Sequence, residues 1–324
     1  MSDLDDWQPT ASLAALESRA QQLAWVRGFF ASRKVMEVET PVMGRCSVTD
    51  LNIGSVPASP QLPGDESRQY WLQTSPEYPM KRLLAAGAGP IYQVARVFRD
   101  GERGVRHNPE FSLLEWYRPG FDDRELMAEV ADLVCGWLGC PRPAYLTYRQ
   151  AFEQFVGVDP FAADDESLRR LCAPWMTDAQ LSRLLRDECL DLLMSLRVEP
   201  ELARMGPVFI TGYPESQAAL ARVSEVDGLR QAHRFELYVG GVELCNGYWE
   251  LTDADEQQRR FDADNRARRR AGRQEMPVDQ ALLAAMRAGV PDCAGVALGL
   301  DRLLMLKLGL DDIAGVLAFP VERA

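Results

Sequence analysis

The first hydrophobic pattern along the chain is helical. Residues 11–33 place an apolar side chain about every 3.6 positions, which predicts an amphipathic helix. The alternation of side chains over residues 35–39 then indicates a strand, and Pro41 ends this strand or confines it to a sheet edge. Residues 44–70 are rich in Gly, Pro and Ser, so we expect an irregular loop there.

Two antiparallel hairpins are predicted from paired apolar segments. Residues 90–99 (PIYQVARVFR) and 109–118 (PEFSLLEWYR) have the pattern of strands, and a charged loop joins them. Residues 234–251 contain two alternating segments on either side of Gly240-Gly241. A pair of glycines tolerates the positive φ angles of a tight hairpin turn, so this hairpin is the clearest one in the sequence.

Helices are predicted at residues 124–138, 178–195 and 255–271, and a strand followed by a helix at 295–309. Residues 145–207 are mostly helical in pattern and carry no chemical motif. We interpret them as an insert in a single domain that spans residues 1–324. Antiparallel strands with scattered helices favour an α+β fold over a doubly wound parallel sheet.

Composition excludes several classes of protein. The formal net charge is −12, whereas proteins that bind long nucleic acids usually have a basic surface. The seven cysteines form no C-x-x-C pair and there are two histidines, so we expect neither disulfides nor a zinc site, but buried cysteines in a reducing compartment. The acidic N-terminus does not resemble a signal peptide, and no apolar run is long enough to span a membrane. A cytoplasmic location fits these observations.

The loop after residue 98 is unusually polar and cationic. It contains Arg99, Arg103, Arg106, His107 and Asn108. A guanidinium donates hydrogen bonds in a planar fork that suits phosphate oxygens, so the loop is a candidate phosphate-binding site. Any one of these arginines, taken alone, is better explained as a solvated loop residue.

The second hairpin carries a glutamate at every seventh position: Glu236, Glu243 and Glu250. Glu236 and Glu243 straddle the glycine turn, so we expect them to face each other. Two facing carboxylates repel unless a cation lies between them, and oxygen ligands suit Mg²⁺. Exposure of all three to solvent is an equally good interpretation of the sequence alone.

A third group lies at the predicted junction of strand and helix: Gly295, Gly299, Asp301 and Arg302. Glycine at such a junction allows a ligand to approach the backbone closely. The same pattern is also found in ordinary turns.

The order of these three groups resembles that of the class II aminoacyl-tRNA synthetases. The strings ETPVM, TSPEYPMKRLLAAG, RHNPEFSLLEWYR, NGYWELTDADEQ and GVALGLDRLLML extend the similarity over almost the whole chain. They resemble the lysyl branch of the family, and in particular the short ligases that modify elongation factor P with lysine or (R)-β-lysine. The resemblance implies a class II catalytic domain, with an antiparallel sheet flanked by helices, that uses ATP and Mg²⁺.

The resemblance also implies roles for individual residues. Arg99 and Arg302 would be catalytic, Asn108 and Phe111 would hold the adenine, and Glu236 and Glu243 would bind Mg²⁺. The implied ATP-binding set is Arg99, Asp100, Gly101, Glu102, Asn108, Phe111, Glu243, Leu244, Gly299 and Arg302. The implied substrate-binding set is Ser75, Pro76, Glu77, Tyr117, Glu250 and Ala297. Carboxylates suit that pocket because a buried ammonium group needs anionic partners.

The chain departs from the lysyl synthetases in four respects. The first motif begins near residue 20, so we expect no anticodon-binding barrel and no recognition of a tRNA anticodon. Ala297 replaces a glycine, as in the ligases that prefer (R)-β-lysine. The second motif usually reads Arg-Asn-Glu, whereas here Glu102 follows Arg99 by three places; either Glu102 takes over that ATP contact or the contact is missing. Lys34 also stands where the first motif often has glycine.

The expected reaction is activation of the amino acid as its adenylate, followed by transfer to a lysine side chain of elongation factor P. Helix 11–33 and Pro41 belong to the motif that forms the dimer interface in the family, so a homodimer is implied. Three alternatives stay open: a shortened synthetase that charges tRNA, a non-catalytic regulatory relative, and an asparagine synthetase of the same fold.

Overall fold

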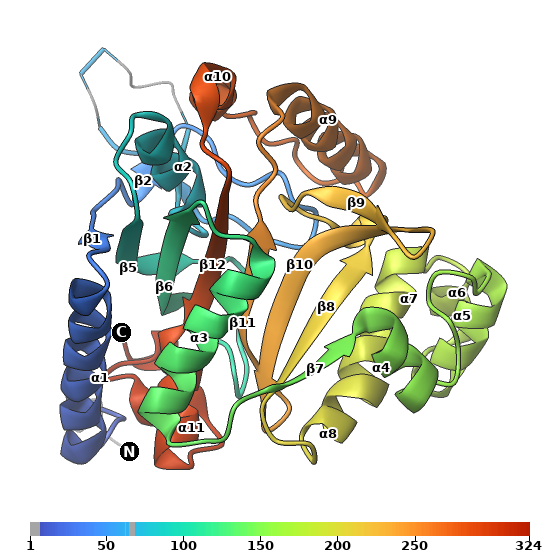
Figure 1. The fold of residues 1–324 in the computed structure, drawn as a ribbon, viewed down its shortest axis with the longest axis horizontal. Coiled ribbons are helices and arrows are strands. Elements are labelled where there is room, and N and C mark those ends of the chain that lie inside the picture. Colours follow the sequence, from blue (N-terminus) through green and yellow to red (C-terminus); the bar gives the residue numbers. More distant parts are fainter. Residues whose placement is uncertain (1–6, 62, 65–68) are drawn as a thin grey trace. The chain divides into compact units, whose positions relative to one another are not determined.

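The computed structural model describes residues 7–61, 63, 64 and 69–324 (Figure 1). The chain divides into two compact units. The first unit joins the described residues up to Phe121 with Thr252–Ala324, and the second is Asp122–Leu251. The interpretation of residues 1–324 as one domain with an insert stays a prediction.

The first unit is built on an open sheet in which β1, β5, β6 and β12 lie side by side in that order. Their bounds are β1 (Met36–Glu37), β5 (Ile91–Phe98), β6 (Glu110–Pro119) and β12 (Cys293–Gly299). β6 is antiparallel to both β5 and β12, and β1 is parallel to β5. The hairpin predicted at 90–118 is therefore confirmed, whereas the strand predicted at 35–39 is only two residues long.

The helices of this unit are α1 (Leu13–Ser32), α2 (Glu77–Ala85), α9 (Ala254–Arg270), α10 (Gln280–Gly289) and α11 (Leu300–Leu308). Helix α1 confirms the helix predicted at 11–33, but not its amphipathic pattern, because Gln22 is buried whereas Leu13 and Trp25 are exposed. The Ser12 hydroxyl accepts the Ala15 N–H at 3.1 Å and caps the helix. Phe30, near its other end, stacks on Tyr92 of β5 with ring centroids 4.3 Å apart. The predicted loop at 44–70 contains part of a small second sheet of short strands, β2 (Met43–Gly44), β3 (Pro57–Ala58) and β4 (Tyr70–Leu72).

Lys34, just after α1, has a φ of 56°. This left-handed conformation costs a residue with a side chain about 1–2 kcal/mol, and glycine avoids that cost. The backbone therefore explains why the first motif often has glycine at this position.

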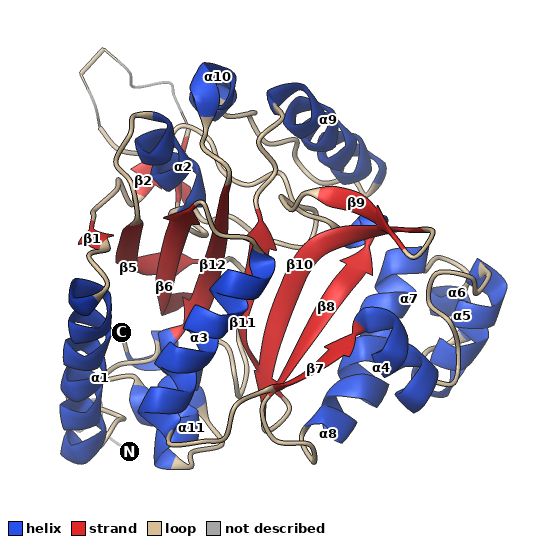
Figure 2. Cartoon of the chain, in the orientation of Figure 1, coloured by secondary structure: helices blue, strands red, loops and turns tan. Residues whose placement is uncertain are grey.

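The second unit contains β11 (Val242–Trp249), β10 (Leu229–Val239), β8 (Val208–Pro214) and β7 (Ala144–Thr147), side by side in that order, with β9 (Val223–Val226) paired to β10 (Figure 2). The hairpin predicted at 234–251 is confirmed. Gly240 and Gly241 have φ angles of 60° and 72° at its turn. A Cβ on Gly241 would lie 2.9 Å from the Glu199 carbonyl oxygen, so the turn also needs glycine for close packing.

The helices of this unit are α3 (Asp123–Leu138), α4 (Tyr148–Phe155), α5 (Asp165–Cys172), α6 (Asp178–Leu181), α7 (Arg186–Leu193) and α8 (Glu199–Leu202). The helix predicted at 124–138 is confirmed, but the one predicted at 178–195 is broken. Helix α7 starts anew because the Glu188 carboxylate accepts the Leu185 N–H at 2.8 Å. Beyond α7, residues 194–198 form a π-helical turn.

No helix in the described parts of the chain is long and apolar enough to cross a membrane. All seven cysteines are free, and Cys172, Cys189, Cys245 and Cys293 are buried. The interpretation as small buried hydrophobic residues is confirmed for these four, while the other three are half-buried.

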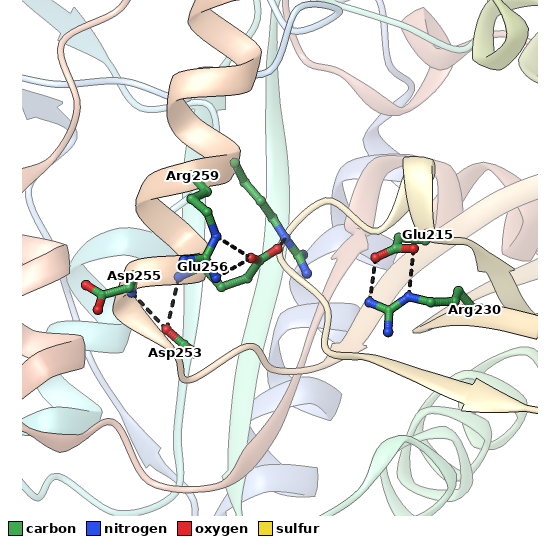
Figure 3. Close-up of polar contacts among 7 residues, drawn as sticks. Glu215, Arg230, Asp253, Asp255, Glu256 and Arg259 are labelled. Carbon is green, nitrogen blue, oxygen red and sulfur yellow. Dashed lines mark hydrogen bonds and ion pairs between the residues drawn. The ribbon is translucent and has the colours of Figure 1, made fainter.

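Polar contacts define the start of helix α9 (Figure 3). At the start of α9, the Asp253 carboxylate accepts the N–H groups of Asp255 and Glu256 at 2.9 and 3.0 Å. These bonds satisfy donors that the first turn of a helix leaves unpaired, so the predicted polar helix at 255–271 has a defined beginning.

Candidate active site

The residues predicted to form the site are divided between the two units. Glu236, Glu243, Leu244 and Glu250 belong to the second unit, and the remaining predicted residues belong to the first. Each group is described within its own unit.

Arg99 lies where β5 ends and the cationic loop begins. Its guanidinium carbon is 5.1 Å from the centroid of the Phe111 ring, and its Nη1 is 3.5 Å from the Glu102 carboxylate. Among the residues that the structure describes, the buried Nε of Arg99 has no hydrogen-bond partner. A buried donor without a partner costs free energy, and a phosphate oxygen would relieve that cost. The loop therefore suits the phosphates of a nucleotide.

Arg302, in the first turn of α11, contacts the same loop. Its Nη2 is 2.7 Å from Nε2 of His107, and its Nε donates to the Arg106 carbonyl oxygen at 3.4 Å. The loop turns back through an isolated bridge between Gly104 and His107, which brings the imidazole to the arginine. Since Arg302 can only donate, Nε2 of His107 accepts and the ring is neutral. The sequence predicted Arg302 as a site residue but gave His107 no role.

Asn108 is buried and both polar atoms of its side chain are engaged. Its Nδ2 donates to the Glu110 carbonyl oxygen at 2.6 Å, and its Oδ1 accepts the Val321 N–H at 3.1 Å. The side chain thus joins the loop to the C-terminal segment. Its role in holding adenine stays a prediction, and the structure gives it a structural role in addition.

A buried carboxylate that the sequence analysis did not select lies at the centre of the predicted substrate pocket. Glu115 on β6 is 2% exposed. It accepts hydrogen bonds from the Ser75 hydroxyl at 2.7 Å and the Tyr117 hydroxyl at 2.6 Å. On β12 its register partner is Ala297. The structure therefore brings Ser75, Tyr117 and Ala297 together around Glu115. Alternation along the strand provided a signal, because residues 115 and 117 share one face.

Glu77 lies in the first turn of α2, next to this group. Its N–H donates to the Ser75 hydroxyl at 3.0 Å, and its carboxylate is 2.7 Å from the ammonium of Lys81. Lys81 is 1% exposed, so this ion pair is largely removed from water. Pro76 precedes the helix and is buried. The predicted pocket therefore contains two carboxylates, Glu115 and Glu77, and the latter forms an ion pair with Lys81.

Glu236 in the second unit is 6% exposed and accepts three hydrogen bonds. Arg234 donates to one oxygen at 2.6 Å, and the hydroxyls of Tyr213 and Tyr238 donate to the other at 2.6 Å each. Burial and the nearby Glu236 charge raise the pKa of both tyrosines, so they stay protonated and donate. A carboxylate can accept about four hydrogen bonds, so Glu236 has room for one further ligand.

The prediction that Glu236 and Glu243 face each other across the turn is wrong. In the register of the hairpin Glu236 pairs with Asn246, and Glu243 pairs with Tyr238. The two carboxylates are offset because the turn pairs Val239 with Val242, so that regular pairing would already place Glu236 opposite Cys245. The irregularity between Leu237 and Tyr238 moves Glu236 one position further, to Asn246. Their role as Mg²⁺ ligands stays a prediction.

Leu244 is 2% exposed, and Glu250 is 1% exposed and forms an isolated bridge with Ala221. Outside the undescribed residues 1–6, 62 and 65–68, no group of three or more His, Cys, Asp or Glu side chains could hold a metal ion. Mg²⁺ is commonly held by one or two carboxylates together with phosphates and water, so the donor pair Glu236 and Glu243 is chemically suitable.

Comparison with known proteins identifies the family. Residues 5–323 match the sequence profile described as tRNA synthetases class II (D, K and N). The chain belongs to this family. A curated relative from Proteus mirabilis (strain HI4320), elongation factor P–(R)-β-lysine ligase, is 49% identical over 328 residues, which cover 100% of both proteins. The predicted family resemblance and the predicted fold class are therefore confirmed.

Within this class II chain, the displaced glutamate of the second motif has a defined position. Gly101 has a φ of 79°, and the turn lets the Glu102 N–H donate to the Arg99 carbonyl oxygen at 3.4 Å. The Glu102 carboxylate consequently reaches the guanidinium of Arg99. Asp100 points its N–H the other way, to the Gly54 carbonyl oxygen at 2.9 Å. Whether Glu102 contacts ATP stays a prediction.

We predict that His107 reports nucleotide binding to the class II site. Partial desolvation and the charges of Arg302 and Arg99 lower the pKa of His107, so without nucleotide it should titrate below the ordinary value of about 6.5. Bound ATP should raise this pKa, because phosphate charge favours the protonated ring. An NMR titration with and without ATP measures the shift. The chain has two histidines, and His107→Asn identifies the signal. A His107 pKa that ATP leaves unchanged would place the phosphates elsewhere.

Proposed function

We propose that the protein is an AMP-forming ligase that activates lysine or (R)-β-lysine and transfers it to a lysine side chain of elongation factor P. The main support for this proposal comes from residues on strand β6. Phe111, Glu115 and Tyr117 alternate along β6 and so share one face of the sheet. Phe111 lies beneath Arg99 at one end of this face, and Glu115 lies about 14 Å further along, from the rise of roughly 3.4 Å per residue.

The residues between Phe111 and Glu115 on this face have small or apolar side chains. Ala95, Val97 and Leu113 form a buried cluster, against which Phe111 and Ala297 pack. A nucleotide at Phe111 and an ammonium group at Glu115 would therefore bind over one continuous floor. This arrangement supports a substrate with a cationic amino group, since a buried ammonium needs a carboxylate partner.

The chemistry then follows from charge. An oxygen of the substrate carboxylate bonds to the α-phosphorus of ATP, and pyrophosphate leaves with the electron pair of the broken bond. Attacker and target are both negative, so donors fixed in advance must supply most of the stabilisation. Arg99, with its buried Nε, and Arg302 are suited to this. Mg²⁺ held by Glu236 and Glu243 would neutralise phosphate charge.

In the second step a neutral amine of the acceptor attacks the carbonyl carbon of the adenylate. AMP leaves, and the nitrogen loses one proton as the amide forms. The full-length relative named elongation factor P–(R)-β-lysine ligase supports elongation factor P as the acceptor. We also propose a cytoplasmic location, which the seven free thiols support.

The acceptor decides between this function and the charging of tRNA. Enzyme, ATP and labelled (R)-β-lysine are incubated with elongation factor P and tRNA in one tube. We expect label on the protein and little or none on tRNA, since the net charge of −12 opposes binding of a polyanion. Label on tRNA alone would establish the shortened synthetase instead. If neither elongation factor P nor tRNA is labelled, and pyrophosphate exchange is also absent, the protein would instead be a non-catalytic relative.

We predict that Ala297→Gly shifts the preference of the enzyme toward α-lysine. The methyl group of Ala297 stands beside Glu115 in the β6–β12 register, where it limits the placement of a second amino group. A single methyl group in a pocket typically changes discrimination by about 1–3 kcal/mol. The ratio of kcat/KM values for the two isomers in pyrophosphate exchange measures this. Ala95→Gly, on the neighbouring strand, is the control, and an equal effect there would remove Ala297 as a specificity residue.

A homodimer is proposed as the working form. Helix α1 and the segment after it expose large apolar side chains: Leu13 is 74% exposed, Met36 49% and Val42 42%. Exposed apolar side chains on one segment favour association of two protein chains. In a dimer with twofold symmetry, this segment of each chain would be buried against the other chain. Light scattering should give twice the mass of the chain, and a stable monomer at micromolar concentration would contradict this.

A further inference from the structure

A buried carboxylate joins the strand that carries Phe111 to the helix that carries Arg302. Asp301 is 2% exposed, and its Oδ2 accepts the Ser112 N–H at 2.7 Å. The ladder between β6 and β12 ends at the pair Gly299 and Leu113, so Asp301 adds one hydrogen bond beyond its end. Ser112 directly follows Phe111, and Asp301 directly precedes Arg302. The carboxylate therefore connects the backbone next to Phe111, predicted to hold the adenine, with the backbone next to Arg302, which belongs to the predicted ATP-binding set.

Helix α1 holds this connection from its other side. Arg19 forms an ion pair with the second oxygen of Asp301 and donates to the Gln22 side chain at 2.8 Å. Gln22, one turn further along, is completely buried and donates to the Leu300 carbonyl oxygen at 3.0 Å. The two side chains therefore fix Leu300 and Asp301, the two residues before Arg302.

Stability alone gives a weak reason for this network. Removing two charges from water costs more free energy than their attraction often returns, and well-packed apolar residues can replace a buried ion pair without loss. A hydrogen-bonded ion pair does fix the relative position of the two elements that it joins. A binding site needs its side chains to be positioned to within a fraction of an ångström.

We propose that Arg19, supported by Gln22, is a positioning residue for the nucleotide: through Asp301 it sets the distance between Phe111 and Arg302. The inference rests on the ATP site of the proposed function and adds a role for α1, which supplies none of the predicted contacts to ATP. It places the control of nucleotide affinity partly in a helix outside the site.

The test compares Arg19→Ala with Arg27→Ala. Arg27 lies on the same helix and forms an exposed ion pair with Glu37 at 3.2 Å, so its loss removes a similar contact far from Asp301. We expect the Kd and KM for ATP to rise at least about tenfold in Arg19→Ala, because a displacement of about 1 Å can cost roughly 10²-fold. The KM for the amino acid should stay within about twofold, and Arg27→Ala should match the wild type.

Arg19→Lys keeps the charge opposite Asp301 and so guards against a variant that does not fold. The lysine ammonium lacks the planar, forked donors with which the guanidinium contacts Asp301 and Gln22 at the same time. We therefore expect a rise in the Kd for ATP that is smaller than in Arg19→Ala. Wild-type affinity for ATP in both Arg19 variants would overturn the proposal, as would an equal rise in the KM for ATP and for the amino acid. Calorimetric binding of ATP needs neither amino acid nor acceptor, so this outcome is independent of whether the ligase reaction itself is found.

Discussion

Replacing Arg99 with alanine should lower lysine-dependent pyrophosphate exchange by about 10²–10³-fold, the usual effect of removing an oriented donor to the transition state. Arg99 lies over Phe111 and has a buried Nε for which the described residues supply no acceptor. These contacts support our proposal that the guanidinium donates to the α-phosphate as charge moves onto the leaving pyrophosphate. Arg99→Lys should recover only part of the loss, because an ammonium keeps the charge but not the fork.

Arg96→Ala is the matched control for Arg99. Arg96 lies on the same strand but is 57% exposed and forms a loose ion pair with Glu110 at 3.8 Å. Its removal should leave the rate of exchange within about twofold, as expected for a surface pair. If Arg99→Ala exchanged pyrophosphate at a near-normal rate, Arg99 would have no role in the chemical step.

Replacing Glu236 with alanine should lower the free energy of unfolding by about 3–5 kcal/mol, because it leaves a buried cation without its partner. Arg234 would keep its carbonyl contact to Gln217 but lose its carboxylate, and Tyr213 and Tyr238 would lose their acceptor. Burial lowers the pKa of Arg234, and in the wild type the Glu236 carboxylate more than offsets this. A guanidinium is not deprotonated in proteins, so the variant keeps the buried charge but lacks the carboxylate that stabilised it. Urea denaturation measures the change.

Glu215→Ala provides the comparison within the same unit. Glu215 also pairs with an arginine, Arg230, through two contacts of 2.6 and 2.8 Å, but at the surface (Figure 3). Its loss should cost about 0–1 kcal/mol. An equally small loss in Glu236→Ala would show that Arg234 and its tyrosines do not need the carboxylate. Magnesium dependence of exchange, measured in Glu236→Gln, separates a role in metal binding from this structural one.

The sequence alone determined most of the elements and the family. Apolar periodicity predicted α1 and the strand–helix junction at Gly299, and alternation around Gly240-Gly241 predicted the β10–β11 hairpin. These signals are local, because helix and strand periods and turn glycines depend on neighbouring residues. The order of motifs then identified the family, since several long strings in one order constrain the fold together.

The tertiary structure decided which of these residues meet. Glu115 became the centre of the predicted substrate pocket only through Ser75, which is distant in sequence. Glu236 lies opposite Asn246 and not Glu243, because cross-strand partners depend on the pairing at the turn and on the irregularity between Leu237 and Tyr238, not on a seven-residue spacing. Asp301 and Arg19 are 282 positions apart, so no pattern along the chain links them. Periodicity defines the face of an element, whereas partners across elements depend on packing and register, which are properties of the folded chain as a whole.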